Sequence, residues 1–240
     1  MKAPRFWSNG KNWIIPAALS PLVMIYRLSI FVNRLNSKNI TCSIPIVCAG
    51  NIVTGGAGKT PTAIAIAKLL ADMGQTPHFL SRGYRGRISG PTLVDPEIHD
   101  SSMVGDEALL LAKIAPTWIS RDREKGALAA ANAGASIIIM DDGHQNYDII
   151  KDLSIIIIDG SFGFGNSRLI PSGPLRESLK SGITRADAVV IIGQDKYATK
   201  EIIKNYSLPI INADIVPVAK DINIKTKSVI AFAGIGRPEK

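Results

Sequence analysis

The chain has 240 residues, 46% of them hydrophobic, which is enough to bury the core of one large domain or two small ones. Its net charge of +8 indicates an anionic partner, but the sequence has no block of like charge and no aromatic RNA-binding signature, so we expect no nucleic-acid partner. The two cysteines, Cys42 and Cys48, have neither metal-ligand spacing nor a paired cluster, which argues against a zinc site and fits free thiols in a reducing cytosol.

The first 40 residues are predicted to form a helical segment at a membrane interface. Residues 13–26 carry no charge, but this run is shorter than the roughly 18 residues that a spanning helix needs, so it should not cross a bilayer. We expect Pro16 and Pro21 to break an early helix and residues 22–35 to form one. Tryptophan and basic residues around the apolar run are typical of a segment that lies on an anionic membrane, and packing against the domain is the equal alternative.

An apolar run that breaks into a glycine-rich turn, residues 46–60, is the feature around which the chain is organised. Glycines let backbone N–H groups surround phosphate oxygens, and Lys59 and Thr60 can serve the terminal phosphates and Mg²⁺. Val53 stands where the usual pattern has its first glycine, so we expect the chain to approach the turn differently. The alternative is an ordinary strand-to-helix turn. The residues predicted to contact nucleotide are Val53, Thr54, Gly55, Gly56, Ala57, Gly58, Lys59 and Thr60.

Beyond this turn, apolar strands alternate with helical patterns, which predicts an α/β fold with a doubly wound, mostly parallel sheet and helices on both faces. A helix should follow the turn from Pro61 and stop at Gly74. Further strands are expected at 76–80, 117–120, 136–140, 153–158, 187–192, 209–212 and 229–233, and further helices at 107–114, 124–133 and 199–206.

Acidic residues follow or open several of these elements. Asp141 and Asp142 come at the carboxyl end of a buried strand, where parallel sheets bind ligands, and a phosphate loop needs such an acid to hold Mg²⁺. A helix cap or a turn is the alternative role. We expect His144 to be a polar surface residue. Asp106 opens a helix, where it is either a cap or the carboxylate that accepts a proton during phosphoryl transfer to a hydroxyl.

Two loops carry arginines that are candidates for binding an anionic substrate, because guanidinium groups bind phosphate in a bidentate manner. One loop contains Arg82 and Tyr84, and the other, a long connection, contains Asn166, Arg168 and Arg176. A solvated basic turn and a plain long connection are the corresponding alternatives.

Five motifs in a fixed order resemble those of the tetraacyldisaccharide 4′-kinases of lipid A synthesis. They are Gly50-Asn51-x-x-Thr54-Gly55-Gly56-x-Gly58-Lys59-Thr60-Pro61, Ser81-Arg82-Gly83-Tyr84, Gly105-Asp106-Glu107, Asp141-Asp142-Gly143-x-Gln145 and a long motif over residues 163–177. Each motif is modest alone, but together they are highly specific and cover nearly the whole chain. The family also tolerates a residue other than glycine where Val53 stands.

The resemblance implies a fold like that of the P-loop NTPases and a kinase that transfers the γ-phosphate of ATP to the 4′-hydroxyl of tetraacyldisaccharide 1-phosphate, giving lipid IVA. It implies ATP and Mg²⁺ as cofactors, and as partners an acylated glucosamine disaccharide 1-phosphate lipid and an anionic membrane surface. We expect no obligate protein partner and a peripheral position on the cytoplasmic face of the bacterial inner membrane. Lys59 and Asp106 would be catalytic, with Asp106 taking the hydroxyl proton, and the metal would lie against Thr60, Asp141 and Asp142.

The same resemblance divides the chain into a membrane-interface segment (1–40), a kinase core (41–225) and the start of a smaller C-terminal lobe (226–240). Members of the family continue beyond this point and carry there a histidine thought to assist the acid that corresponds to Asp106. None of the three histidines of this chain occupies that place. We therefore expect the chain to be truncated and its activity to be weak or absent.

Two other classes of protein share parts of this pattern. Membrane-associated ATPase switches of the MinD/ParA kind have the same Gly-Lys-Thr core, but they carry a second lysine just before the paired glycines, where this chain has Thr54. A metal-delivery GTPase would need tracts rich in histidine and cysteine, which the sequence lacks. Both comparisons favour the kinase.

Overall fold

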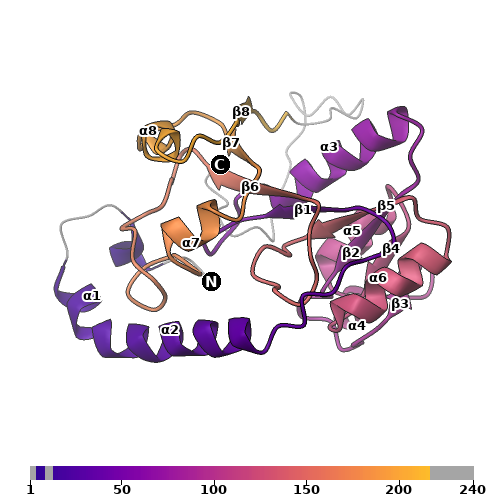
Figure 1. The fold of residues 1–240 in the computed structure, drawn as a ribbon, viewed down its shortest axis with the longest axis horizontal. Helices are drawn as coiled ribbons and strands as arrows, with labels where there is room; N and C mark the ends of the chain where they lie inside the picture. Colours follow the sequence, from indigo (N-terminus) through magenta and orange to yellow (C-terminus); the bar gives the residue numbers. More distant parts are fainter. Residues whose placement is uncertain (1–3, 9–12, 217–240) are drawn as a thin grey trace, which may run out of the picture.

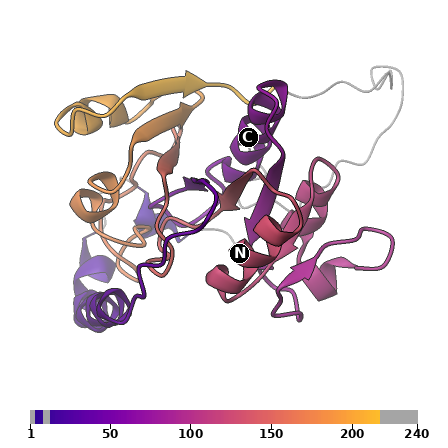
Figure 2. The same ribbon diagram turned by 45° about the vertical axis from the view of Figure 1, so that its right-hand side comes forward.

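The computed structural model of the chain describes residues 4–8 and 13–216. Its centre is an eight-stranded sheet with the order β3-β4-β2-β5-β1-β6-β7-β8 (Figures 1 and 2). Neighbouring strands are parallel except at the β3 edge, where β3 runs antiparallel to β4. The strands are β1 (Ile46–Gly50), β2 (Pro77–Ser81), β3 (Thr92–Leu93), β4 (Thr117–Ile119), β5 (Ile137–Asp141), β6 (Leu153–Asp159), β7 (Ala188–Ile192) and β8 (Ile210–Ala213).

Helices cover both faces of the sheet, because successive side chains of each strand point to opposite faces. On one face, Ala49 and Ile139 pack against α3 and α5, and on the other, Cys48 and Met140 belong to the cluster that includes α6. Helices α7 and α8 cover the second face over β6 and β7. The helices are η1 (Arg5–Trp7), α1 (Ile14–Ala18), α2 (Ser20–Leu35), α3 (Lys59–Asp72), α4 (Ser101–Val104), α5 (Asp106–Ala112), α6 (Arg123–Asn132), α7 (Leu179–Ile183) and α8 (Thr199–Lys204).

The doubly wound parallel architecture predicted from the alternating pattern is confirmed. Short elements such as β3, α4 and α7 had not been predicted, since they are too brief to show a periodicity. The early helix is broken as predicted, at Leu19 between α1 and α2, with Pro21 in the first turn of α2. Pro16 does not end a helix but lies inside α1, in its first turn. Backbone N–H groups in a first turn have no partner within the helix, so proline costs little there. The strand expected at 229–233 and the lobe expected from residue 226 lie outside the described residues.

Helix α2 runs along the outside of the molecule, at the bottom of Figure 1, and has no buried residue. The N-terminal segment is joined instead to the long loop between β6 and α7. The Asn166 side-chain amide donates a hydrogen bond to the Phe6 carbonyl (2.9 Å), Trp7 Nε1 donates to the Pro171 carbonyl (3.0 Å), and the Ser172 hydroxyl donates to the Pro16 carbonyl (2.9 Å). Within the described part of the chain, no helix has the length and apolar character required to cross a bilayer.

Candidate phosphate-binding and catalytic site

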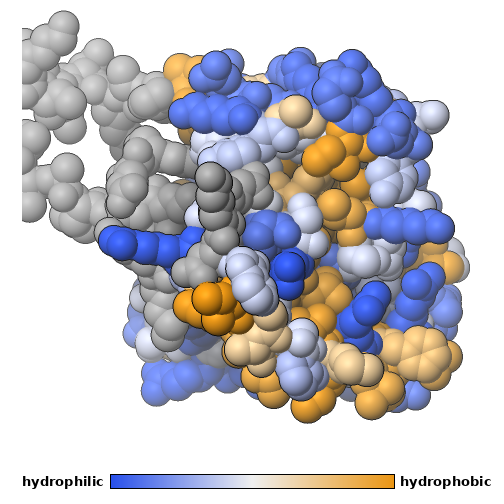
Figure 3. Space-filling model, turned by 90° about the vertical axis from the view of Figure 1, so that its left-hand side faces the viewer, coloured by the Kyte–Doolittle hydropathy of each residue, from blue (hydrophilic) through white to orange (hydrophobic). Residues whose placement is uncertain are grey.

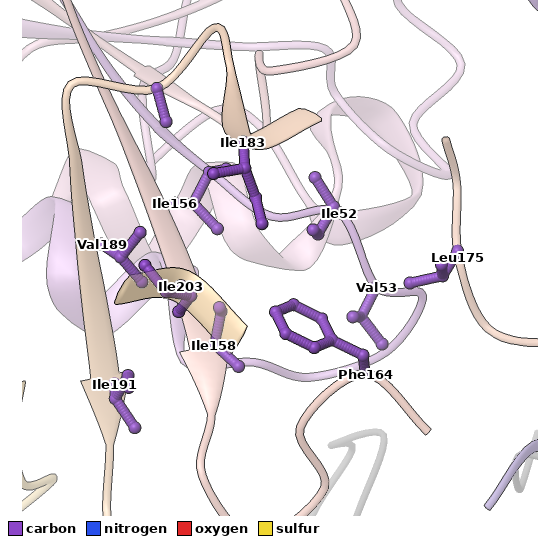
Figure 4. Packing of buried hydrophobic residues seen from close by; sticks show 11 residues of the cluster. Ile52, Val53, Ile156, Ile158, Phe164, Leu175, Ile183, Val189, Ile191 and Ile203 are labelled. Atoms are coloured by element: carbon purple, nitrogen blue, oxygen red, sulfur yellow. The ribbon is translucent and has the colours of Figure 1, made fainter. Parts of the chain in front are cut away.

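The chain enters the glycine-rich turn through Val53, which is buried and forms an isolated antiparallel bridge with Leu175. The next residue, Thr54, donates its backbone N–H to the Pro174 carbonyl (2.8 Å). Figure 4 shows the Phe164 ring between the side chains of Ile158 and Val53. A valine fits at this point because the backbone is extended and its side chain packs into a core made by the long loop, so the missing glycine has a structural reason.

The turn ends at Gly58, whose φ of +87° is a conformation that favours glycine. A Cβ at this position would also collide with the Ile192 side chain. Lys59 follows as the first residue of α3 and is buried, which is unusual for a lysine unless it has an anionic partner. Its Nζ lies 3.8 Å from Asp142 Oδ2. The free N–H groups at the start of α3 and the lysine cation therefore point to one anion site.

Asp141 ends β5 beside β1, in register with Ala49, and this pairing brings its carboxylate to the start of α3. The Thr60 hydroxyl donates to Asp141 Oδ2 (3.2 Å), whereas Asp141 Oδ1 is buried without a hydrogen-bond partner. Burial, reinforced by the negative charge of Glu107, raises the pKa of Asp141 to about 7. A buried carboxylate oxygen without a partner, next to a hydroxyl, suits a divalent cation.

The described residues contain no cluster of three His, Cys, Asp or Glu side chains able to hold a metal by themselves. Mg²⁺ beside a nucleotide does not need such a cluster, because one or two carboxylates and the phosphate oxygens complete its coordination. Thr60 and Asp141 therefore fit a magnesium ion whose other ligands come from nucleotide and water.

Asp142 adopts a positive φ of 56°, and its carboxylate lies close to two cations. Its Oδ1 accepts a hydrogen bond from Arg176 Nη1 at 2.7 Å, while Lys59 lies at the longer distance given above. Burial would raise the pKa of Asp142, but Lys59 and Arg176 outweigh it and hold the pKa below its usual range. The two neighbouring acids thus differ: Asp142 is paired with cations, whereas Asp141 keeps one buried oxygen without a hydrogen-bond partner.

Glu107, in the first turn of α5, belongs to this site although its sequence context did not predict it. Glu107 is exposed, but the part of its side chain that faces the site is removed from water, which raises its pKa; Lys59 opposes that rise, and Asp142 and Asp106 reinforce it. Glu107 therefore interacts electrostatically with both Lys59 and Asp142. The only sequence signal is its place directly after Asp106. A single acidic pair at a helix start is common, which is why the pattern alone does not mark it.

His144 is buried, so the prediction of a surface histidine was wrong. Its Nδ1 lies 2.9 Å from the Ser154 hydroxyl and its Nε2 lies 3.0 Å from the Gly182 carbonyl. Burial and the charge of Arg185 lower the pKa of His144 to about 4, against the opposing charge of Glu177. The histidine therefore serves as a neutral link between the segment after β5 and helix α7.

The other residues predicted for the site lie around it at different depths. Asp106 is exposed at the start of α5, where its Oδ1 accepts the Glu107 N–H (3.1 Å). Arg82 and Tyr84 lie on the exposed loop after β2. Arg168 is exposed, and the Asn166 side chain is engaged by backbone groups of its own loop and of the N-terminal segment. Of the residues assigned to substrate, only Arg176 reaches the acids after β5.

The parallel sheet, the phosphate loop and the acid at the end of the neighbouring strand define a nucleotide-binding protein of the P-loop class. Comparisons with known proteins narrow this class. The model of the tetraacyldisaccharide-1-P 4′-kinase family matches residues 15–240. The chain is 49% identical over 240 residues to the tetraacyldisaccharide 4′-kinase of Paramagnetospirillum magneticum and 45% identical over 243 residues to that of Rhodospirillum rubrum, covering 100% of this chain and 73% of each relative.

The chain belongs to the tetraacyldisaccharide 4′-kinase family. Its fold also matches the crystal structure of LpxK from Aquifex aeolicus in complex with ATP. That match has a TM-score of 0.67 and 23% sequence identity, and it covers 90% of this chain and 85% of the other. The fold predicted from the resemblance is thereby confirmed.

Proposed function

We propose that this protein is a kinase that transfers the γ-phosphate of ATP to the 4′-hydroxyl of tetraacyldisaccharide 1-phosphate. The observation that carries the proposal is the meeting of Thr60 and Asp141 beside the buried Lys59, in a chain that belongs to the 4′-kinase family. This arrangement has the parts that phosphoryl transfer needs, since catalysis of that reaction is mostly positioning and electrostatic stabilisation.

Each part of the site has a role in the proposed reaction. The backbone N–H groups from Gly55 to Thr60 hold the triphosphate, since the Thr54 N–H is bonded to the Pro174 carbonyl, and the Lys59 cation neutralises charge that develops during transfer. Thr60 and Asp141 hold Mg²⁺, which neutralises phosphate charge when bound. The acceptor hydroxyl attacks the γ-phosphorus, the bond to the β-phosphate oxygen breaks, and ADP leaves.

We assign the proton of the attacking hydroxyl to Asp106. This carboxylate is exposed at the start of α5, where an acceptor approaching from solvent can reach it. Its neighbour Glu107 is also exposed, but its carboxylate interacts electrostatically with Lys59, Asp141 and Asp142, which suits support of the metal site. Arg82 and Tyr84, on the exposed loop after β2, are proposed to contact the sugar or its phosphate.

Helix α2 supports a peripheral position on a membrane. Its side chains Met24, Ile25, Leu28 and Leu35 are between 61% and 73% exposed, although all four are large and apolar. Figure 3, which views this end of the molecule, shows hydrophobic surface along its lower edge with hydrophilic side chains among it. A helix with apolar and basic residues binds an anionic interface, and an acylated substrate stays in that interface. We place the protein on the cytoplasmic face of the inner membrane, where ATP is present.

The test is to incubate a full-length version of the protein with γ-labelled ATP and tetraacyldisaccharide 1-phosphate in mixed micelles, with the Paramagnetospirillum magneticum relative as a positive control. Label should appear on the lipid. Lys59→Ala should lower kcat by about 10²–10³-fold, because a cation that stabilises the transferring phosphoryl group is lost. Lys68→Ala, which removes an exposed lysine of the same helix, should not. Asp106→Ala should also lower kcat.

The same assay separates the kinase from an ATPase switch. A kinase releases little free phosphate and labels the lipid only when the acceptor is present, whereas a switch releases phosphate to water regardless of the acceptor. Release of phosphate at the same rate with and without the lipid, and no labelled lipid under conditions in which the relative labels it, would overturn the proposed function.

A further inference from the structure

Helix α2 is connected to the catalytic centre through Arg176. The Tyr26 hydroxyl donates a hydrogen bond to the Arg176 carbonyl at 2.9 Å, across 150 positions of sequence. The backbone N–H of the same arginine donates to the Ile52 carbonyl at 2.9 Å, one residue before Val53 begins the phosphate loop. The backbone of residue 176 is therefore held from two sides, by the strand-to-loop segment on one and by Tyr26 on the other.

The side chain of Arg176 continues this connection into the site. Its Nη1 donates to Asp142 Oδ1 at 2.7 Å and to Gln145 Oε1 at 3.2 Å. Gln145 in turn donates through Nε2 to the Asn51 carbonyl (2.7 Å) and to Glu177 Oε1 (3.0 Å). The guanidinium group is thus oriented by short contacts that depend on where the backbone of residue 176 lies.

A second path from α2 reaches the neighbouring residue, Glu177. The Arg34 guanidinium lies over the Tyr147 ring, 5.9 Å from its centroid, and Arg185 lies over the same ring at 4.9 Å. Arg185 then binds both carboxylate oxygens of Glu177, at 2.8 and 2.9 Å. Glu177 is almost fully buried and both of its carboxylate oxygens accept hydrogen bonds, so the segment that follows Arg176 is held in place. The Tyr26 hydrogen bond acts on Arg176, just before this fixed segment.

The consequence for the phosphate loop follows from competition between two cations for one carboxylate. Asp142 is bonded to Arg176 at a distance typical of a charge-assisted hydrogen bond, and it is 3.8 Å from Lys59, which is longer than such a bond. If Arg176 withdraws, Asp142 can close onto Lys59. The lysine would then be engaged by protein rather than by phosphate.

We infer that Tyr26 is a positioning residue for nucleotide binding: its bond to the Arg176 carbonyl holds the arginine against Asp142 and so leaves Lys59 available to the phosphates. This inference rests on the proposed function, since it concerns the same site. It gives the helix that carries the exposed apolar face a direct contact with the segment that organises the catalytic acids.

The test is a double-mutant cycle of Tyr26→Phe and Arg176→Gln, read as the affinity for Mg·ATP by calorimetry and as kcat with the lipid acceptor. Loss of one hydrogen bond should weaken Mg·ATP binding about 3- to 10-fold in Tyr26→Phe. In the Arg176→Gln background the same change should have no further effect, because the arginine through which Tyr26 acts is absent. Ser29→Ala is the control, since it removes a hydroxyl of α2 that bonds only to the backbone of its own helix in the structure.

Unchanged nucleotide affinity in Tyr26→Phe, or an equal loss in both backgrounds, would overturn the inference. A lower melting temperature in Tyr26→Phe than in Ser29→Ala without a change in affinity would reduce Tyr26 to a structural tether, which also overturns it. The calorimetric cycle needs no acceptor. Failure of lipid phosphorylation with an intact cycle would therefore count against the proposed reaction and leave the positioning role standing.

Discussion

Helices α2 and α3 have similar lengths, 16 and 14 residues, and both are rich in apolar side chains, but they use those side chains differently. In α3, Ala63 and Ala67 lie buried against the sheet, and Ile64, Ile66 and Leu70 pack beside them, half-buried. In α2 no residue is buried, and large side chains such as Met24 and Leu28 face solvent. One helix therefore completes the fold, whereas the other leaves its apolar surface exposed.

The difference shows that hydrophobicity alone does not tell where a helix packs. The sheet decides the position of α3, because the helix begins directly at the phosphate loop and must lie over β1 and β5. For α2, the position depends on the Tyr26 hydrogen bond to the long loop and on the contact of Arg34 with the Tyr147 ring. Substitutions in the two helices and changes of pH test this contrast.

The largest effect on stability is expected from Ala63→Leu in α3. Ala63 is fully buried among Ala49, Phe79 and Ile139, so added methylene groups must displace neighbours and should cost about 1–3 kcal/mol of unfolding free energy. Denaturant unfolding would measure it. The matched control is Ala65→Leu, an exposed position of the same helix, which should change stability by about 0.5 kcal/mol or less. Equal losses at the two positions would mean that the inner face of α3 is not packed as described.

An intermediate effect is expected from pH on nucleotide binding. The raised pKa of Asp141, about 7, means that the carboxylate becomes protonated as pH falls through neutrality, and a metal ligand must be deprotonated. Mg·ATP affinity should therefore decrease as pH falls below 7, with a slope that approaches about tenfold per pH unit. Calorimetry on the protein and on Asp141→Asn would separate the titration of Asp141 from that of the nucleotide, because the nucleotide titrates in the same way in both experiments. A slope that persists in Asp141→Asn would contradict the assignment.

The raised pKa of Asp141 has the opposite effect on the stability of the protein without ligand: lowering the pH weakens nucleotide binding but stabilises the fold. A carboxylate whose pKa is raised in the folded state binds its proton more tightly there, so Asp141 favours folding at low pH. That contribution should be lost as pH rises from the ordinary value near 4 through 7. We expect binding to anionic vesicles through α2 to be the same at pH 6 and pH 8, because α2 contains no aspartate, glutamate or histidine.

The smallest effect on stability is expected from Ile25→Ser with Leu28→Ser in α2. Both side chains are more than 60% exposed, so unfolding free energy should change by about 0.5 kcal/mol or less. Affinity for anionic vesicles should fall about tenfold or more in a sedimentation assay, since two apolar contacts with lipid are lost. Leu69→Ser in α3 is the control because Leu69 is 63% exposed. An equal loss of vesicle binding in that control would argue against a specific role of α2.

Local sequence is enough to specify the main features of this protein. The spacing of apolar residues and the residue types of short motifs predict the phosphate loop, the buried parallel strands, the helix after the loop and the acids at the end of β5. These features depend on neighbouring residues, so a short stretch carries the whole signal. The apolar and basic character of residues 20–35 is equally plain from their composition.

The details that make these parts a site come from tertiary contacts. Whether Asp141 or Asp142 faces Thr60, and which cation holds the other acid, depends on the register of β5 against β1 and on a loop more than 30 residues further along the chain. The burial of His144 depends in the same way on helix α7. Such contacts join segments far apart in sequence, and packing fixes them. No local pattern encodes which partner a charged side chain will meet.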